Sequence, residues 1–155
     1  MTAIEVVAIL DDLQSNRLAS IKALMDHIAP LNDAGAVAVL GKLENYDRSQ
    51  AVEAIKLKLP INLTADQIAP VLEGTGSNRL AAIKSLNDHI GILDAQGTEA
   101  VLGNLNGYDR FQAIQTLAKS GHVARGLTND DVKLILGDIR SNQTEGLAAL
   151  SPYVQ

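Results

Sequence analysis

The chain contains no cysteine and no tryptophan, and its only aromatic residues are Phe111, Tyr46, Tyr108 and Tyr153. The absence of cysteine excludes a disulfide framework, a thiolate metal site and a cysteine nucleophile. The core must therefore consist of aliphatic side chains, which suits thin layers of closely packed short helices. With 155 residues, 46% of them apolar, the chain can form one domain with a substantial core.

Basic runs and long apolar runs are missing as well. The net charge is −5, and no cluster of Lys or Arg forms a stripe that could follow a phosphate backbone. No segment reaches the roughly eighteen apolar residues of a membrane span, and the first residues lack the pattern of a signal peptide. We therefore expect no nucleic-acid or membrane partner. A cytoplasmic location is the default expectation, although a signal peptide already removed would leave no trace.

An internal repeat dominates the sequence. Residues 15–55 match residues 77–117 at 23 of 41 positions without a gap, at an offset of 77 − 15 = 62 residues. Four arginines divide these blocks at intervals of 31 residues: Arg17, Arg48, Arg79 and Arg110. A period of this length is typical of stacked helical hairpins. We predict a single domain over residues 1–155 with five units, near 2–31, 32–62, 63–93, 94–126 and 127–155.

Each unit is expected to contain two short helices. Apolar residues recur at helical spacing in the first helix of each unit, as in Val6, Ile9, Leu10 and Leu13. Because each helix has one apolar stripe, the hairpins must stack to cover it. The predicted fold class is all-α, either an α-solenoid or a compact helical-repeat bundle. Pro70 falls inside a predicted helix and the Gly-Thr-Gly turn at 74–76 follows, so the middle of the chain is a candidate hinge.

Capping residues mark the expected helix starts. Thr2, Thr64 and Thr128 each precede Glu, Gln or Asp by three residues, which predicts capping boxes or close relatives, with Asp33 in the equivalent position of the second unit. The second helices are expected to begin at a column of capping residues: Asn16, Asp47, Asn78, Asp109 and Asn142.

The residues around the arginines also carry a family resemblance. The steps Asn16-Arg17-Leu18, Asp47-Arg48, Asn78-Arg79-Leu80 and Asp109-Arg110 resemble an uncharacterised domain-of-unknown-function family of short helical repeats, in which an acidic residue precedes arginine-leucine and an apolar helix. The resemblance covers about four of the five units, although Ser49 and Phe111 replace leucine after two of the arginines. It implies an all-helical repeat and no particular activity.

The four arginines are the first candidates for a binding site. An arginine in the first turn of a helix lies against the positive end of the helix dipole, which costs roughly 0.3–1 kcal/mol unless something compensates. One interpretation is that each guanidinium joins neighbouring units by reaching a carboxylate or the carbonyls at the end of an adjacent helix. The other is that a row of exposed arginines binds an acidic peptide or an anionic ligand.

Tyrosine and histidine offer weaker candidates. Tyr46 and Tyr108 precede expected helix caps, so they are either hydrophobic staples or exposed binding contacts. His27 and His89 lie near the ends of second helices, where the dipole accounts for them, so we predict no metal site. The sequence also lacks dinucleotide, P-loop, nucleophile-elbow and zinc-protease motifs. We therefore predict no cofactor and no catalytic residue.

The pattern as a whole predicts a non-enzymatic helical-repeat module that binds a protein or peptide partner. The alternative is a structural component that assembles into a homo-oligomer, for which Val6, Val7, Ile9 and Leu10 of the first helix offer an apolar contact. An enzyme built on convergent polar groups such as Arg79, Asp88 and His89 is the third possibility.

Overall fold

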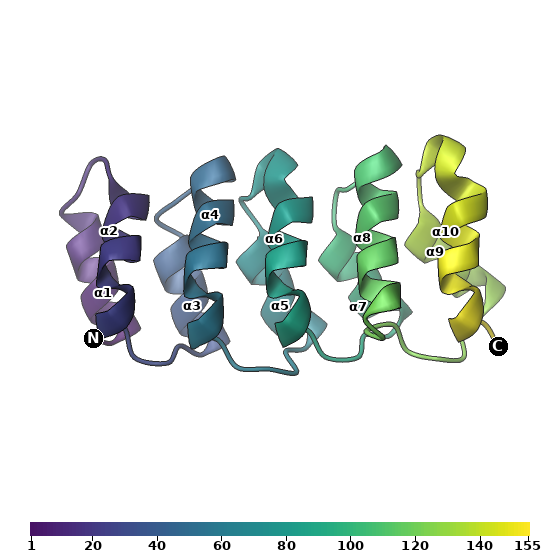
Figure 1. The fold of residues 1–155 in the computed structure, drawn as a ribbon, viewed down its shortest axis with the longest axis horizontal. Coiled ribbons are helices and arrows are strands. Elements are labelled where there is room, and N and C mark those ends of the chain that lie inside the picture. Colours follow the sequence, from purple (N-terminus) through teal and green to yellow (C-terminus); the bar gives the residue numbers. More distant parts are fainter. The chain divides into compact units, whose positions relative to one another are not determined.

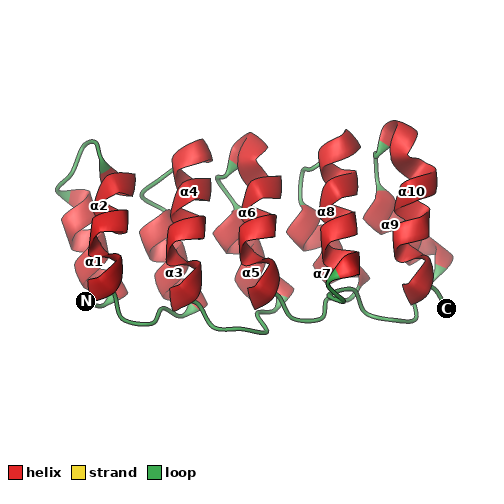
Figure 2. Ribbon diagram, in the orientation of Figure 1, coloured by secondary structure: helices red, strands yellow, loops and turns green.

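The computed structural model describes residues 1–155 and contains ten α-helices joined by turns and loops (Figure 1). There is no strand, and only three isolated β-bridges join extended residues (Figure 2). The predicted all-α fold class is confirmed. None of the helices combines the length and the apolar character needed to cross a bilayer.

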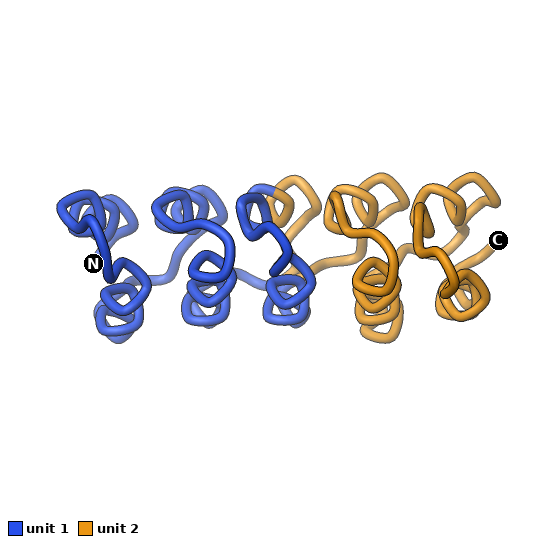
Figure 3. Tube along the Cα trace, turned by 90° about the horizontal axis from the view of Figure 1, so that it is seen from above, with its two compact units in different colours: residues 1–61, 70–89 blue, residues 62–69, 90–155 orange.

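The chain divides into two compact units, drawn in blue and orange in Figure 3. Unit 1 comprises residues 1–61 and 70–89, and unit 2 comprises residues 62–69 and 90–155. The division passes through helix α5 (Ala65–Leu72), just before Pro70, which lies inside this helix as predicted. The organisation as a single domain and the central hinge stay predictions.

Unit 1 contains two complete hairpins and parts of a third. Its helices are α1 (Ala3–Asp11), α2 (Arg17–Leu24), α3 (Asp33–Leu40), α4 (Asn45–Ile55), α6 (Arg79–Leu86) and the end of α5. Helix α1 packs beside α3, α2 packs beside α4, and α4 packs beside α6. Equivalent helices of successive hairpins therefore lie side by side, which is the packing of a helical repeat. Fully buried aliphatic side chains fill the space between them, among them Val6, Leu10, Ile21, Val39, Val52 and Ile83.

Unit 2 follows the same rule. Besides the start of α5 it contains α7 (Ala95–Leu102), α8 (Gly107–Lys119), α9 (Asn129–Leu136) and α10 (Gln143–Leu150). Helix α7 packs beside α9, and α8 packs beside α10. The linkers between hairpins pair through parallel bridges at Leu63 with Ile90, Leu93 with Val123, and Leu127 with Val154. These backbone hydrogen bonds satisfy polar groups that a buried linker would otherwise leave unpaired.

Short 3₁₀ turns flank most of the second helices. Four of them extend the C-terminal ends of α2, α4, α6 and α10: Met25–His27, Lys56–Lys58, Asn87–His89 and Ser151–Tyr153. Two others lead into α6 and α10: Gly76–Asn78 and Arg140–Asn142.

The observed starts of the first helices agree with the predicted caps at three places and differ at one. Thr2 and Thr128 form complete capping boxes with Glu5 and Asp131. At Thr64, the backbone amide donates to the side chain of Gln67 over 3.0 Å. In the second unit, however, the cap is Asn32, whose side chain accepts from the amide of Gly35, and Asp33 is the first residue inside α3.

The expected caps of the second helices are correct in position at Asn16, Asn78 and Asn142 and wrong at the other two. Asp47 and Asp109 lie inside α4 and α8, which begin two residues earlier. Asn16, Asn78 and Asn142 do stand before a helix, but none of their side chains caps it. The reason is backbone conformation: a capping side chain needs an extended residue, whereas Asn16 is left-handed and Asn78 and Asn142 end 3₁₀ turns.

Candidate functional site

Arg110 lies in the first turn of α8 and is 4% exposed. Its guanidinium donates to carbonyl oxygens at the C-terminal ends of two helices: Gly103 and Leu105 after α7, and Leu134, Ile135 and Leu136 of α9, over 3.0 to 3.3 Å. It also pairs with the carboxylate of Glu99. The positive charge therefore sits at the negative ends of two helix dipoles, which compensates its unfavourable place at the start of α8.

Arg48 and Arg17 repeat this arrangement in unit 1. Arg48 is 7% exposed and donates to the carbonyls of Leu40 in α3 and of Pro70 and Val71 in α5, with the closest contact, to Pro70, at 2.8 Å. Arg17 is half-buried and donates to the carbonyls of Leu10 and Leu13 and to that of Lys42 in the next hairpin. In all three cases one arginine joins the first helices of two successive hairpins.

Arg79, the last of the four candidate arginines, is half-buried in the first turn of α6. Burial lowers the pKa of the Arg79 guanidinium below its ordinary value, and the negative charge of Glu73 opposes this shift. Burial lowers the pKa of Arg48 in the same way, again against the charge of Glu73. The joining role, the first of the two interpretations of the arginines, is thus seen directly for Arg17, Arg48 and Arg110.

The tyrosines lie where their staple interpretation does not apply. Tyr46 and Tyr108 are inside the first turns of α4 and α8 and are 61% and 60% exposed. Tyr108 contacts Phe111, with ring centroids 5.9 Å apart. The histidines also differ from each other, since His27 is exposed whereas His89 is buried with Nδ1 3.1 Å from the carbonyl oxygen of Pro60. No three His, Cys, Asp or Glu side chains are grouped so that they could hold a metal ion.

A different surface of unit 1 is mostly apolar. A groove of about 640 Å³ runs between α1 and α3, and its lining includes Ala3, Ile4, Val7, Pro30, Ala34 and Ala38. We call it the α1/α3 groove. Ile4 is 82% exposed, although it is a large aliphatic residue. Contiguous exposed apolar surface of this kind is characteristic of binding sites, whereas isolated exposed residues are not.

Local structure brings α1 and α3 close together at this groove. Asn32 caps α3 by accepting from the amide of Gly35 at 2.7 Å. A Cβ atom on Gly35 would lie only 3.1 Å from the Cβ of Ala3, so glycine and alanine permit the close approach of the two helices. The lining therefore combines small residues, where the two helices approach each other, with the larger side chains of Ile4, Val7 and Pro30.

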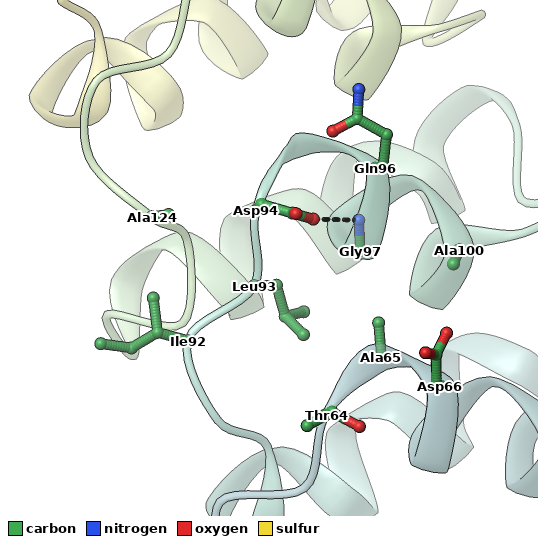
Figure 4. Close-up of a pocket in the computed structure, with 10 residues that line it drawn as sticks. All are labelled: Thr64, Ala65, Asp66, Ile92, Leu93, Asp94, Gln96, Gly97, Ala100 and Ala124. Carbon is green, nitrogen blue, oxygen red and sulfur yellow. Dashed lines mark hydrogen bonds between the residues drawn. The ribbon is translucent and has the colours of Figure 1, made fainter.

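Unit 2 contains the equivalent groove, between the start of α5 and α7 (Figure 4). We call it the α5/α7 groove. The same local structure recurs 62 residues later, because Asp94 caps α7 through the amide of Gly97 at 2.6 Å and a Cβ on Gly97 would approach Ala65 to 3.1 Å. The side chains at two of the lining positions are different. Asp66 stands at the position of Ile4, and Gln96 stands at the position of Ala34.

A third groove, beside α9 in unit 2, extends the comparison. It is lined by Thr128, Asn129, Asp130 and Lys133, which occupy the positions of Thr2, Ala3, Ile4 and Val7 of α1. Aspartate therefore stands in the position of Ile4 at both other grooves. Since helices of this kind also form with aspartate at that position, the fold does not require an exposed isoleucine at residue 4. The apolar character of the α1/α3 groove must have another reason.

The grooves could not be found from the sequence alone. Their lining residues come from two helices and a linker. Ile4 lies outside the segments in which the 62-residue repeat matches without a gap, and Ala34 is a small residue with no pattern of its own. The usable signal was the repeat itself, since aligning its copies shows Ile4 opposite Asp66. No protein family, curated protein or solved structure matches this chain. The resemblance to a family of helical repeats therefore stays a prediction.

Proposed function

We propose that this chain is a non-enzymatic helical-repeat module that binds a protein or peptide partner, and that the α1/α3 groove is the binding site. The observation that carries the proposal is the exposed apolar lining of this groove at positions where the equivalent grooves carry aspartate, glutamine and lysine. An apolar surface that the fold does not need, and that water solvates poorly, is best accounted for by a partner that covers it.

The arginines are weaker candidates for a binding site than the α1/α3 groove. Arg48 and Arg110 are almost fully buried and their donors are occupied by backbone carbonyls, so a ligand would have to displace hydrogen bonds that hold hairpins together. Tyr46 and Tyr108 remain available at the surface, since more than half of each side chain is exposed. They are secondary candidates, because neither tyrosine lines any of the three grooves described above.

A selection from a random peptide display library on immobilised chain tests the proposal. The comparison variant is Ile4→Asp with Ala34→Gln, which gives the α1/α3 groove the residues of its own counterpart. We expect the natural chain to enrich peptides that the variant does not retain. Amide chemical shifts should change at α1, at α3 and at residues 29–32 when such a peptide is added.

Ile92→Asp provides the matched control. Ile92 is 76% exposed and lines the α5/α7 groove, so this variant removes a comparable apolar side chain from the wrong groove. It should retain the peptides that the natural chain retains. If no peptide is enriched, or if the enriched peptides bind the variant with Asp at position 4 equally well, the α1/α3 groove is not the binding site.

A further inference from the structure

The first hairpin exposes positions that the later hairpins bury. Ile9, the seventh residue of α1, is 38% exposed, whereas the seventh residue of every other first helix is fully buried: Val39, Val71, Val101 and Ile135. Leu24, the last residue of α2, is half-buried, whereas the last residues of three other second helices are fully buried: Ile55, Leu86 and Leu150. The first hairpin is the only one in the structure with no hairpin packed before it, so these positions face the preceding hairpin.

The last hairpin shows the opposite pattern. Leu136, the eighth residue of α9, is half-buried, whereas the eighth residue of every other first helix is fully buried: Leu10, Leu40, Leu72 and Leu102. Leu147, the fifth residue of α10, is 49% exposed, whereas the fifth residues of the equally long α2 and α6, Ile21 and Ile83, are fully buried. These positions therefore face the following hairpin.

The chain thus exposes both halves of its own hairpin-to-hairpin contact. We call Ile9 and Leu24 the leading face, and Leu136 and Leu147 the trailing face. Terminal units of helical repeats usually carry polar residues on their outer side, because a polar outer side keeps the protein soluble. Here all four positions keep large aliphatic residues, although water covers them in part.

The contact between the first two hairpins shows what such faces do. There α1 packs beside α3 and α2 packs beside α4. The trailing-face positions of the first hairpin hold Leu10 and Ile21, the leading-face positions of the second hold Val39 and Ile55, and all four side chains are fully buried. Aliphatic residues at these positions therefore suffice to bring one hairpin against the next.

We infer that the leading face of one copy of this chain binds the trailing face of a second copy, and so continues the hairpin packing from chain to chain. The inference is independent of the proposed function, because neither face contains a residue that lines the α1/α3 groove. The two faces are different surfaces, so a pair of copies leaves one of each uncovered. Further copies can therefore add to the pair.

The contact between copies differs from the internal contacts in one respect. Gln143 is the first residue of α10, at the position where α2 and α6 begin with Arg17 and Arg79. Arg17 donates to carbonyls of its own hairpin and to that of Lys42 in the next one. Glutamine is shorter and has two N–H donors instead of five. Association between copies therefore depends on aliphatic contacts and is weaker than the packing of hairpins within the chain.

Sedimentation equilibrium of the natural chain from about 10 µM to about 1 mM tests the inference, a range suited to a small, weak interface. The average mass should rise with concentration. Ile9→Lys and Leu147→Lys should each stay monomeric, because the interface would bury an unpaired lysine. Ile92→Lys is the matched control, since it changes another exposed isoleucine and should associate like the natural chain. Circular dichroism checks that each variant keeps its helices.

Mixing the two monomeric variants tests the pairing of unlike faces. The Ile9→Lys variant keeps an intact trailing face, and the Leu147→Lys variant keeps an intact leading face. An equimolar mixture should therefore form a 1:1 dimer that does not grow further as concentration rises.

Gln143→Arg should strengthen association. The new guanidinium would supply donors for carbonyls at the end of α1 in the next copy, as Arg17 does for Lys42. We expect the Kd between copies to fall about tenfold. Gln96→Arg adds the same charge at an exposed residue of α7 outside both faces and should leave the Kd unchanged.

Four outcomes would overturn the inference without touching the peptide-binding proposal. They are a natural chain that stays monomeric at about 1 mM, a mixture of the two lysine variants that forms no dimer, a Gln143→Arg variant that associates no more tightly, and a Leu147→Lys variant that dimerises alone. The last would show that leading faces pair with each other. Loss of association in Ile4→Asp with Ala34→Gln would instead place the second copy in the α1/α3 groove.

Discussion

Replacing Arg110 by methionine isolates what the buried guanidinium does. Methionine has a similar length and keeps the aliphatic packing, but it has no donor. The substitution deprives five carbonyl oxygens of a hydrogen-bond donor, two after α7 and three in α9, and leaves Glu99 without its partner. Because the residue is 4% exposed, water can replace the lost donors only if the hairpins separate.

The expected loss of folding stability is large for the replacement of one side chain. Removing one member of a buried, hydrogen-bonded ionic group costs about 3–5 kcal/mol, and leaving a single buried carbonyl unpaired costs about 1–3 kcal/mol. We expect Arg110→Met to lower the free energy of unfolding by about 3–5 kcal/mol. For a chain of this size that corresponds to a fall in Tm of roughly 6–20 °C. The equivalent change at half-buried Arg17, with three carbonyl bonds, should cost about 1–2 kcal/mol.

Thermal melts followed by circular dichroism measure the change, and hydrogen exchange locates it. Protection should fall in α7, α8 and α9 and stay unchanged in α1 to α3. Arg125→Met is the control, because Arg125 is exposed, donates to one carbonyl and lies over the ring of Tyr153, so its loss should cost less than about 1 kcal/mol. If Arg110→Met lowers Tm no further than this control, the carbonyl bonds do not hold the hairpins together.

The remaining predictions concern backbone, caps and titration. Gly137→Ala should lower the free energy of unfolding by about 1–3 kcal/mol, because the residue has φ +51° and a Cβ there would lie 2.8 Å from Nε of Arg110. Gly121→Ala is the control, because Gly121 has φ +74° but open space around it, so this variant measures the backbone cost alone. Equal losses of stability in the two variants would contradict the predicted clash with Arg110. Thr128→Ala should cost about 1 kcal/mol in urea unfolding, at least twice the effect of Asp47→Ala, whose residue lies inside α4. The amide and hydroxyl of Thr2 lower the pKa of Glu5, so the carboxylate adds stability that is lost as pH falls through this depressed pKa; a carbon-13 titration midpoint at or above the ordinary glutamate value would refute it. Ile4→Asp with Ala34→Gln should leave the Tm within about 2 °C, since aspartate in a first turn suits the helix dipole, and a larger fall would show that the apolar groove is structural.

The sequence predicted the helices well because their determinants are local. Apolar periodicity and the threonine caps depend on residues within four positions of each other, so Thr2 and Thr128 could be read as helix starts without knowledge of packing. The predicted caps at Asp47 and Asp109 were wrong because local sequence does not show the backbone conformation of the preceding turn. A capping residue works only on an extended backbone, and the turns that precede α4 and α8 place the start of each helix two residues earlier.

The candidate site could be predicted only in part. Arg17, Arg48, Arg79 and Arg110 stood out because an arginine at a helix start is unfavourable by itself. The carbonyl partners of Arg17, Arg48 and Arg110 lie 22 to 26 residues away or at the end of the preceding helix, for example Pro70 for Arg48 and Leu136 for Arg110. Main-chain carbonyls occur at every residue, so no sequence pattern marks which of them an arginine will reach.

What the sequence determined by itself is the all-helical repeat: its period, its hairpins and the aliphatic stripes that force them to pack, all of which follow from short-range spacing. Only the tertiary structure decided which arginines became buried and bound carbonyls of two successive hairpins, and which apolar residues stayed exposed to solvent. Ile4 and Val6 are two positions apart in one helix, yet one is 82% exposed and the other is fully buried. Burial depends on which neighbouring helix covers each face, and that is settled by packing between segments about thirty residues apart.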